Sequence, residues 1–284
     1  MTLPDFILTS RVNQVWDNSG MDNLDKCLDK QHFRNYTDEV LYHYNSRGFR
    51  DAEWPDDLSS AVWCFGDSFT VGLGTPFKYI WAQQLGQVLN CRTINVSMDG
   101  ASNQWISRKV HKVIEEIAPK VIVIQWSYIH RAELPNTKLN DEDRRIHINK
   151  LYIDNINELW EIFINLVHGI EQNKQNTRVI HSFIPKFADN TDIFNKWEKI
   201  KGPDWPNVPK NLTEFNKLST MVVNELKNFF KLYKTFENYY RLHNGLEYVS
   251  EIIPIDLARD GFHYDRLTTQ TFVDAVRELL VNRA

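Results

Sequence analysis

The chain has 284 residues, a formal net charge of −4 and 42% hydrophobic residues, which suits one large α/β domain or one domain with additions. The weakly acidic balance, with no long basic run, creates no field that favours nucleic acid, so we expect no nucleic-acid partner. The three cysteines are scattered and form no C-x-x-C pair, so neither a disulfide framework nor a thiolate zinc site is expected.

The sequence pattern contains neither a membrane span nor an export signal. No stretch approaches the roughly 20 apolar residues that a span needs, and residues 1–18 lack the sustained apolar core of a signal peptide. We therefore expect no membrane partner and a cytoplasmic or virion-associated protein. The oligomeric state is left open by these patterns.

The chain divides at about residue 60. Residues 1–60 are polar and weakly periodic, and we interpret them as a lead-in that covers one edge of a sheet. Within them, Tyr42 to Asp51 indicates a short extended piece with a turn at Ser46 to Gly48. Residues 61–284 form the main domain, in which apolar runs alternate with helical patterns.

Five candidate strands lie in the main domain, at 61–65, 92–96, 121–126, 178–183 and 248–255, and the third is a continuous apolar run typical of a strand buried on both faces. Helical periodicity occupies 79–89, 102–117, 151–171 and 267–281. This alternation predicts a five-stranded parallel sheet with helices on both faces. Residues 185–212, rich in Pro and aromatic side chains, form an insertion, which we interpret either as a substrate lid with an aromatic platform or as a self-packed excursion or partner contact.

Ser68 follows the first of these strands, in the segment Gly66-Asp67-Ser68, and a helical pattern begins directly after it. A serine in such a strand–turn–helix junction lies beside backbone N–H groups that can hold an oxyanion, which suits a nucleophile. A turn or N-cap role would place serine there equally well. The other strand ends decide between the two, because chemistry in open parallel sheets gathers beyond the carboxyl ends of the strands.

Asp260 and His263 precede the last predicted helix and are three positions apart around a glycine. A turn there can fold the carboxylate onto one imidazole nitrogen and leave the other to act on Ser68 as a general base. Gly100, after the second strand, can bring its backbone N–H close to a ligand. A turn-forming role for Asp260 and a surface position for His263 are the alternatives.

In this order, Gly66-Asp67-Ser68, Gly100 and Asp260-x-x-His263 resemble the SGNH/GDSL hydrolase family, over roughly residues 60–284. Residues 45–50 are similar to a lead-in that often precedes this domain. The resemblance implies a three-layer α/β/α, flavodoxin-like fold and ester hydrolysis through an acyl-serine. It implies that Ser68 is the nucleophile, that His263 is base and acid, and that Asp260 orients His263. The N–H groups of Ser68 and Gly100 would line the oxyanion hole.

The sequence departs from this family after the third strand. The family has Gly-x-Asn there, and the Asn side chain is a further oxyanion donor, whereas this chain has Gln125-Trp126-Ser127-Tyr128. Ser127 or Tyr128 is the candidate substitute. Loss of one such donor lowers a rate by on the order of 10²–10³.

No cofactor or metal is expected. Gly72-x-Gly74 lacks the third glycine of a dinucleotide fingerprint, no P-loop is present, and the histidines form no H-E-x-x-H pair. We therefore predict a serine esterase that acts on an acyl ester, with an O-acetyl group on a carbohydrate favoured, so the partner is a small-molecule or glycan ester. The alternatives are a weak or inactive glycan-binding or structural protein with the same fold, and an acyltransferase.

Overall fold

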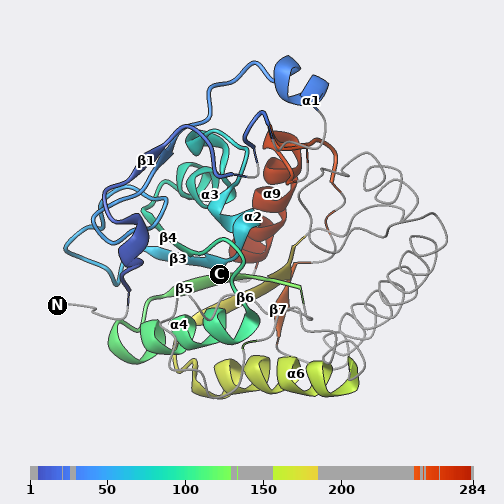
Figure 1. Ribbon diagram of the computed structural model, residues 1–284. Coiled ribbons are helices and arrows are strands. Elements are labelled where there is room, and N and C mark those ends of the chain that lie inside the picture. The colour runs from blue at the N-terminus through green and yellow to red at the C-terminus, as the bar shows by residue number, and fades with distance from the viewer. Residues whose placement is uncertain are drawn as a thin grey trace.

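The computed structural model describes residues 6–20, 22–25, 30–128, 133, 156–184, 246–249, 252, 254–261 and 263–282 (Figure 1). At its centre is a parallel sheet of five strands in the order β4-β3-β5-β6-β7. The strands are β3 (Val62–Gly66), β4 (Thr93–Ser97), β5 (Val121–Trp126), β6 (Arg178–Phe183) and β7 (Glu247–Tyr248). Counted along the chain, this is the order 2-1-3-4-5 of flavodoxin-like sheets, whose ligand sites lie where the order reverses, here between β3 and β5.

Helices cover both faces of the sheet (Figure 1). On one face lie α4 (Asn103–Glu116) and α6 (Ile156–Asn173), and on the other α3 (Trp81–Leu89) and α9 (Arg266–Asn282). Successive strand residues point to opposite faces, so Trp63 and Phe65 enter the cluster under α4 and α6, while Val62 and Cys64 enter the cluster under α3 and α9. The expected three-layer α/β/α fold is confirmed.

The start and the buried face of α4 follow directly from its sequence. The Ser102 hydroxyl accepts the backbone N–H of Trp105 at 3.0 Å and so satisfies one of the unpaired donors of the first turn. The residues that recur at helical spacing, Trp105, Ile106, Val110, Val113 and Ile114, are all buried against the sheet. No helix in the described part of the chain combines the length and the apolar character that crossing a bilayer would require.

The expected fifth strand was too long. β7 pairs with β6 only through Ile180↔Glu247 and His181↔Tyr248, and one further bond runs from the Val249 N–H to the His181 carbonyl at 2.9 Å. A ladder could not continue through Pro254, which has no N–H to donate. Residues 185–212, and residues 151–155 of the expected helix 151–171, lie outside the described residues.

The first 60 residues contain the short elements η1 (Thr9–Arg11), β1 (Val15–Trp16), α1 (Lys30–Asn35) and β2 (Tyr42–His43). β1 and β2 pair antiparallel, and the turn expected at 46–48 closes with a bond from the Gly48 N–H to the Asn45 carbonyl at 2.9 Å. The remaining short elements, α2 (Ser68–Val71) and η2 (Phe77–Tyr79), follow β3.

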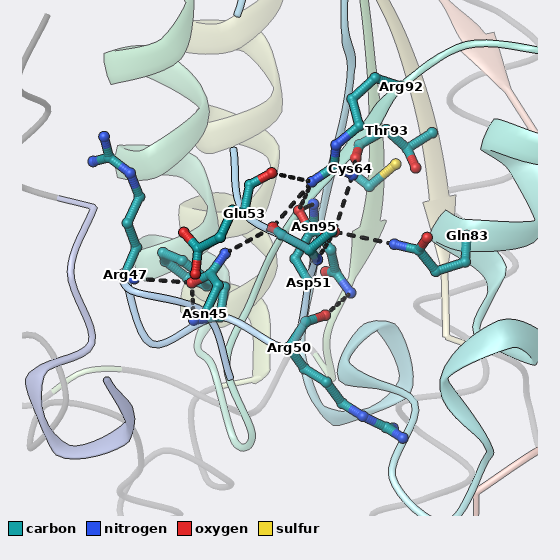
Figure 2. Close-up of polar contacts among 12 residues, drawn as sticks. Asn45, Arg47, Arg50, Asp51, Glu53, Cys64, Gln83, Arg92, Thr93 and Asn95 are labelled. Carbon is teal, nitrogen blue, oxygen red and sulfur yellow. Dashed lines mark hydrogen bonds and ion pairs between the residues drawn. The ribbon is translucent and has the colours of Figure 1, made fainter. Parts of the chain in front are cut away.

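Asp51 attaches this lead-in to β4, the edge strand of the sheet (Figure 2). Its fully buried carboxylate accepts the Asn95 N–H at 3.1 Å, forms an ion pair with Arg92 at 2.8 Å, and accepts from Gln83 Nε2 at 3.0 Å. Burial raises the pKa of Asp51 to about 6, although Arg92 and the N–H donors act in the opposite direction. The backbone N–H of Asn95, on the edge strand β4, thus finds its hydrogen-bond acceptor in the Asp51 side chain of the lead-in.

Candidate active site

Ser68 lies at the junction that the sequence predicts, between the end of β3 and the start of α2. Asp67 is the N-cap of α2, and its Oδ1 atom accepts the Phe69 N–H at 3.0 Å. Ser68 itself is only 3% exposed. The capping role that could have explained a serine here is therefore taken by its neighbour, so the Ser68 side chain is left to another partner.

That partner is His263. The Nε2 atom of His263 lies 2.8 Å from Ser68 Oγ, and the Nδ1 atom lies 2.5 Å from Asp260 Oδ2. Asp260 Oδ1 also accepts the His263 backbone N–H at 3.0 Å, which closes the short turn. With Nδ1–H donated to the carboxylate, Nε2 is left to accept the Ser68 hydroxyl proton. The structure thus brings together all three side chains that the sequence analysis selected.

The electrostatics of His263 favour its protonated form. Complete burial is the largest single influence and opposes the charge, but Asp260, Asp67 and Asp99 together outweigh it, with Asp260 contributing most. The pKa of His263 is therefore raised above its ordinary value of 6.5. An imidazole in this position stabilises the proton that it would take from Ser68.

Two backbone N–H groups at the site, those of Ser68 and Gly100, have no acceptor among the residues that the structure describes. Ser68 is the first residue of α2, so its N–H has no partner within the helix. Gly100 lies in the turn after β4 with φ of 70°, and a bond from the Met98 N–H to the Gly66 carbonyl fastens that turn beside β3. Within the described residues neither N–H donates a hydrogen bond. Both are therefore available to a ligand oxygen.

Ser127 is one of the two candidate substitutes for the Asn that the resemblance implies, and it uses both of its donor groups inside the protein. Its hydroxyl donates to Asp67 Oδ2 at 2.6 Å, and its N–H donates to Asn103 Oδ1 at 2.9 Å. In this arrangement Ser127 has no hydrogen left for an oxyanion. The other candidate, Tyr128, packs against the apolar cluster on the α3–α9 face.

Two polar groups beside the site were not selected from the sequence. Asn103 donates from Nδ2 to the carbonyls of Ser127 and Tyr128 at 3.2 and 3.3 Å, and so fixes the chain after β5. Gln125 accepts from Thr70 Oγ1 at 3.0 Å and donates to Tyr264 Oη at 2.9 Å, which joins α2 to the residue after His263. The only sequence signal for Asn103 was its position after the N-cap serine of α4.

Gly72 and Gly74 lie where a side chain would collide with neighbouring segments, so they allow close packing of the chain. A Cβ atom at Gly74 would lie 2.9 Å from the Ala258 Cβ and 3.0 Å from the N atoms of Arg259 and Asp260. The loop that carries Asp260 therefore lies directly on this turn. Over the described ranges, no group of three or more His, Cys, Asp or Glu side chains could hold a metal ion.

No protein-family model matches the sequence, and no curated protein matches it. Solved structures similar to the chain include a GDSL-like lipase from Bacteroides thetaiotaomicron, with 13% identity, a TM-score of 0.43, and coverage of 82% of this chain and 93% of that one. A family two carbohydrate esterase from Clostridium thermocellum, solved with cellohexaose, has 12% identity, a TM-score of 0.44, and coverage of 82% and 66%. An acetyl xylan esterase from Butyrivibrio proteoclasticus has 11% identity, a TM-score of 0.42, and coverage of 81% and 66%.

Proposed function

We propose that this protein is a serine esterase that cleaves an acyl ester through an acyl-serine intermediate. The observation that carries the proposal is the continuous hydrogen-bonded line from Ser68 Oγ through His263 to Asp260, buried at the carboxyl end of β3. A serine hydroxyl is a poor nucleophile by itself, and an oriented imidazole within 2.8 Å removes that limitation.

In the proposed reaction, Ser68 Oγ attacks the acyl carbon while its proton passes to His263 Nε2. The oxyanion of the tetrahedral intermediate accepts from the N–H groups of Ser68 and Gly100. The intermediate collapses as His263 returns the proton to the leaving alcohol. Water, deprotonated by His263, then attacks the acyl-serine and releases the carboxylic acid, and Ser68 regains its proton.

We further propose an O-acetyl group on a carbohydrate as the substrate. Aromatic side chains stack on sugar rings, and residues 185–212 contain Trp197 and Trp205 among several prolines. Those residues follow β6 directly, although they lie outside the described part of the chain. A serine that is only 3% exposed favours a small acyl group, such as acetyl, over a long acyl chain.

The direct test measures hydrolysis of a small chromogenic acetyl ester by the wild type and by Ser68→Ala. We expect the variant to lose turnover by on the order of 10³-fold or more. Equal rates would remove Ser68 from the mechanism. Labelling of the wild type by a fluorophosphonate, and its absence in Ser68→Ala, reports the nucleophile without requiring the natural substrate.

One observation favours a second candidate, a glycan-binding protein with little or no turnover. The donors of Ser127 are engaged by Asp67 and Asn103, which leaves two backbone N–H groups for the oxyanion instead of three donors. This candidate predicts carbohydrate binding without fluorophosphonate labelling. An acyltransferase would label at Ser68 and pass the acyl group to an added sugar alcohol in preference to water.

A further inference from the structure

A closed ring of hydrogen bonds joins three segments that are far apart in the sequence. The Gly74 N–H donates to Tyr42 Oη at 2.7 Å, and the Tyr42 hydroxyl donates to Asp22 Oδ2 at 2.7 Å. Arg259 donates to the same Asp22 oxygen from Nη2 at 2.6 Å and from Nε at 3.0 Å. The ring closes because the Arg259 backbone N–H donates to the Gly74 carbonyl at 2.9 Å.

The members of this ring flank the two halves of the Ser68–His263 pair. Gly74 lies in the turn that follows α2, the helix that begins with Ser68, and Arg259 immediately precedes Asp260. Asp22 and Tyr42 come from the lead-in, and both are completely buried. The side chains of the lead-in thus bridge the serine-bearing turn and the histidine-bearing loop.

Arg50 fixes the ring from the side of the serine. Its guanidinium is fully buried and donates to the carbonyls of Val71, Gly72 and Thr75, which follow or end α2. It also lies 4.3 Å from the centroid of the Tyr42 ring, a cation–π contact. A rigid guanidinium that bonds several carbonyls at once holds the turn in a single position relative to Tyr42.

Such rigidity matters because Ser68 and His263 are 195 positions apart and no covalent link fixes their separation. Proton transfer between them requires a hydrogen-bond distance, and a displacement of about 1 Å can lower a rate on the order of 10²-fold. The bond between Asp260 and His263 is local to one loop, so it does not set the distance from that loop to Ser68.

We propose that the ring formed by Asp22, Tyr42, Gly74 and Arg259 is a positioning device that, together with the Gln125 link between Thr70 and Tyr264, sets the separation of Ser68 and His263. The inference rests on the proposed function for its consequence in catalysis. Under this proposal the lead-in positions the side chains of the site, in addition to covering the sheet edge. None of the four residues touches the reacting atoms, so all of them act through Ser68 and His263.

The sharpest test compares Tyr42→Phe with Tyr44→Phe. Each change removes one buried phenolic hydroxyl from the same segment, but the Tyr44 hydroxyl has no hydrogen-bond partner in the described structure, whereas the Tyr42 hydroxyl is a ring member. Both variants are assayed for kcat and KM on a chromogenic acetyl ester and for fluorophosphonate labelling. We expect Tyr42→Phe to lower kcat and the labelling rate about 10–100-fold with KM within about twofold, and Tyr44→Phe to behave as wild type.

A spectroscopic measurement tests the ring without turnover. In protein with ¹⁵N-labelled histidine, Ser68→Ala changes the chemical shift of His263 Nε2 because the hydrogen bond to Ser68 Oγ is lost. We expect that change in the wild-type and Tyr44→Phe backgrounds and a reduced change in Tyr42→Phe. If the wild type hydrolyses no ester but this pattern holds, the proposed function fails and the ring stands.

Two outcomes would overturn the proposal. The first is that Ser68→Ala changes the His263 Nε2 chemical shift as much in the Tyr42→Phe background as in the wild type. The second is that kcat of Tyr42→Phe falls only in proportion to the fraction of that variant that is unfolded. Should Tyr42→Phe fail to fold, Arg259→Lys takes the same measurements. This change keeps the charge at a side chain that is 12% exposed but cannot supply two nitrogens to Asp22. Wild-type behaviour of Arg259→Lys in both assays would likewise reject the ring as a positioning device.

Discussion

The Nε2 atom of His263 lies 2.8 Å from Ser68 Oγ, on a side chain whose other ring nitrogen is held by Asp260. Three carboxylates, Asp260, Asp67 and Asp99, act on the imidazole, and together they outweigh its burial. The pair therefore combines a serine that needs a base with a base whose proton affinity is increased. Its pH dependence follows from this arrangement.

Because the pKa of His263 is raised above 6.5, kcat/KM is expected to rise with pH through a value above 6.5, where the imidazole becomes neutral and able to accept a proton. Asp260→Asn removes the main stabilising charge, so the acid limb moves to lower pH, and the plateau falls on the order of 10³–10⁴-fold. A pH–rate profile on a chromogenic acetyl ester measures both changes. An acid limb that stays in place would contradict the assigned role of Asp260.

The same raised pKa has the opposite consequence for stability. The contribution of the His263–Asp260 pair to folding is fully present below the unfolded pKa of His263 and is lost as pH rises through the higher folded value. The proposed esterase activity and this part of the stability are therefore expected to change in opposite directions with pH.

Ser127→Ala tests whether the Ser127 hydroxyl serves the oxyanion. Since that hydroxyl donates to Asp67 Oδ2, we expect turnover to fall less than about tenfold and the free energy of unfolding to fall by about 1.5–3 kcal/mol. Ester kinetics and urea unfolding measure the two quantities. If turnover instead falls on the order of 10²–10³-fold and the stability is unchanged, Ser127 belongs to the oxyanion hole.

Gly74→Ala is expected to displace the loop that carries Asp260. Its Cβ would lie 2.9–3.0 Å from atoms of Ala258, Arg259 and Asp260, and the residue has φ of +73°. Gly20→Ala is the matched control, because Gly20 has φ of +85° and nothing within 4 Å of the added atom.

Backbone strain alone should cost Gly20→Ala about 1–2 kcal/mol in the free energy of unfolding, and Gly74→Ala should lose about 1–3 kcal/mol more from overpacking. Only Gly74→Ala should also lose ester hydrolysis. Equal unfolding free energies for the two variants in urea would show that the 258–260 loop moves to accept the added Cβ atom without a loss of stability.

Asp51→Asn tests the buried carboxylate at the β4 edge. Its folded pKa of about 6 exceeds the ordinary 3.8, so its favourable contribution is present below pH 3.8 and is lost as pH rises through 6. The unfolding free energy of the wild type, relative to Asp51→Asn, should therefore fall between pH 4 and pH 7. Urea unfolding at several pH values measures this difference, with the exposed Asp56→Asn as control. A relative stability that rises over that interval would show that Arg92 outweighs burial.

The sequence by itself determined most of the sheet and the local parts of the site. β5 and β6 have the predicted bounds, and β3 and β4 are shifted by one residue. The stretches 62–65 and 121–124 are continuously apolar because both faces of their strands are buried. The pairing of Asp260 with His263 was also accessible, since three positions around a glycine form a local turn. The length of β7 was not: Pro254 sets only an outer limit, and the observed end at Tyr248 depends on where the pairing with β6 stops.

Only the tertiary structure decided which polar groups are occupied and which remain available. No periodicity or spacing links Ser127 to Asp67, Arg50 to the carbonyls after α2, or Asp22 to Arg259, since these partners lie between 21 and 237 positions apart. Their bonds form because burial leaves each donor no water to bond, so every partner must come from whichever segment the fold brings close. The residue types at the site could be read along the chain. Their hydrogen-bond partners and relative positions depend on contacts that exist only after the chain has folded.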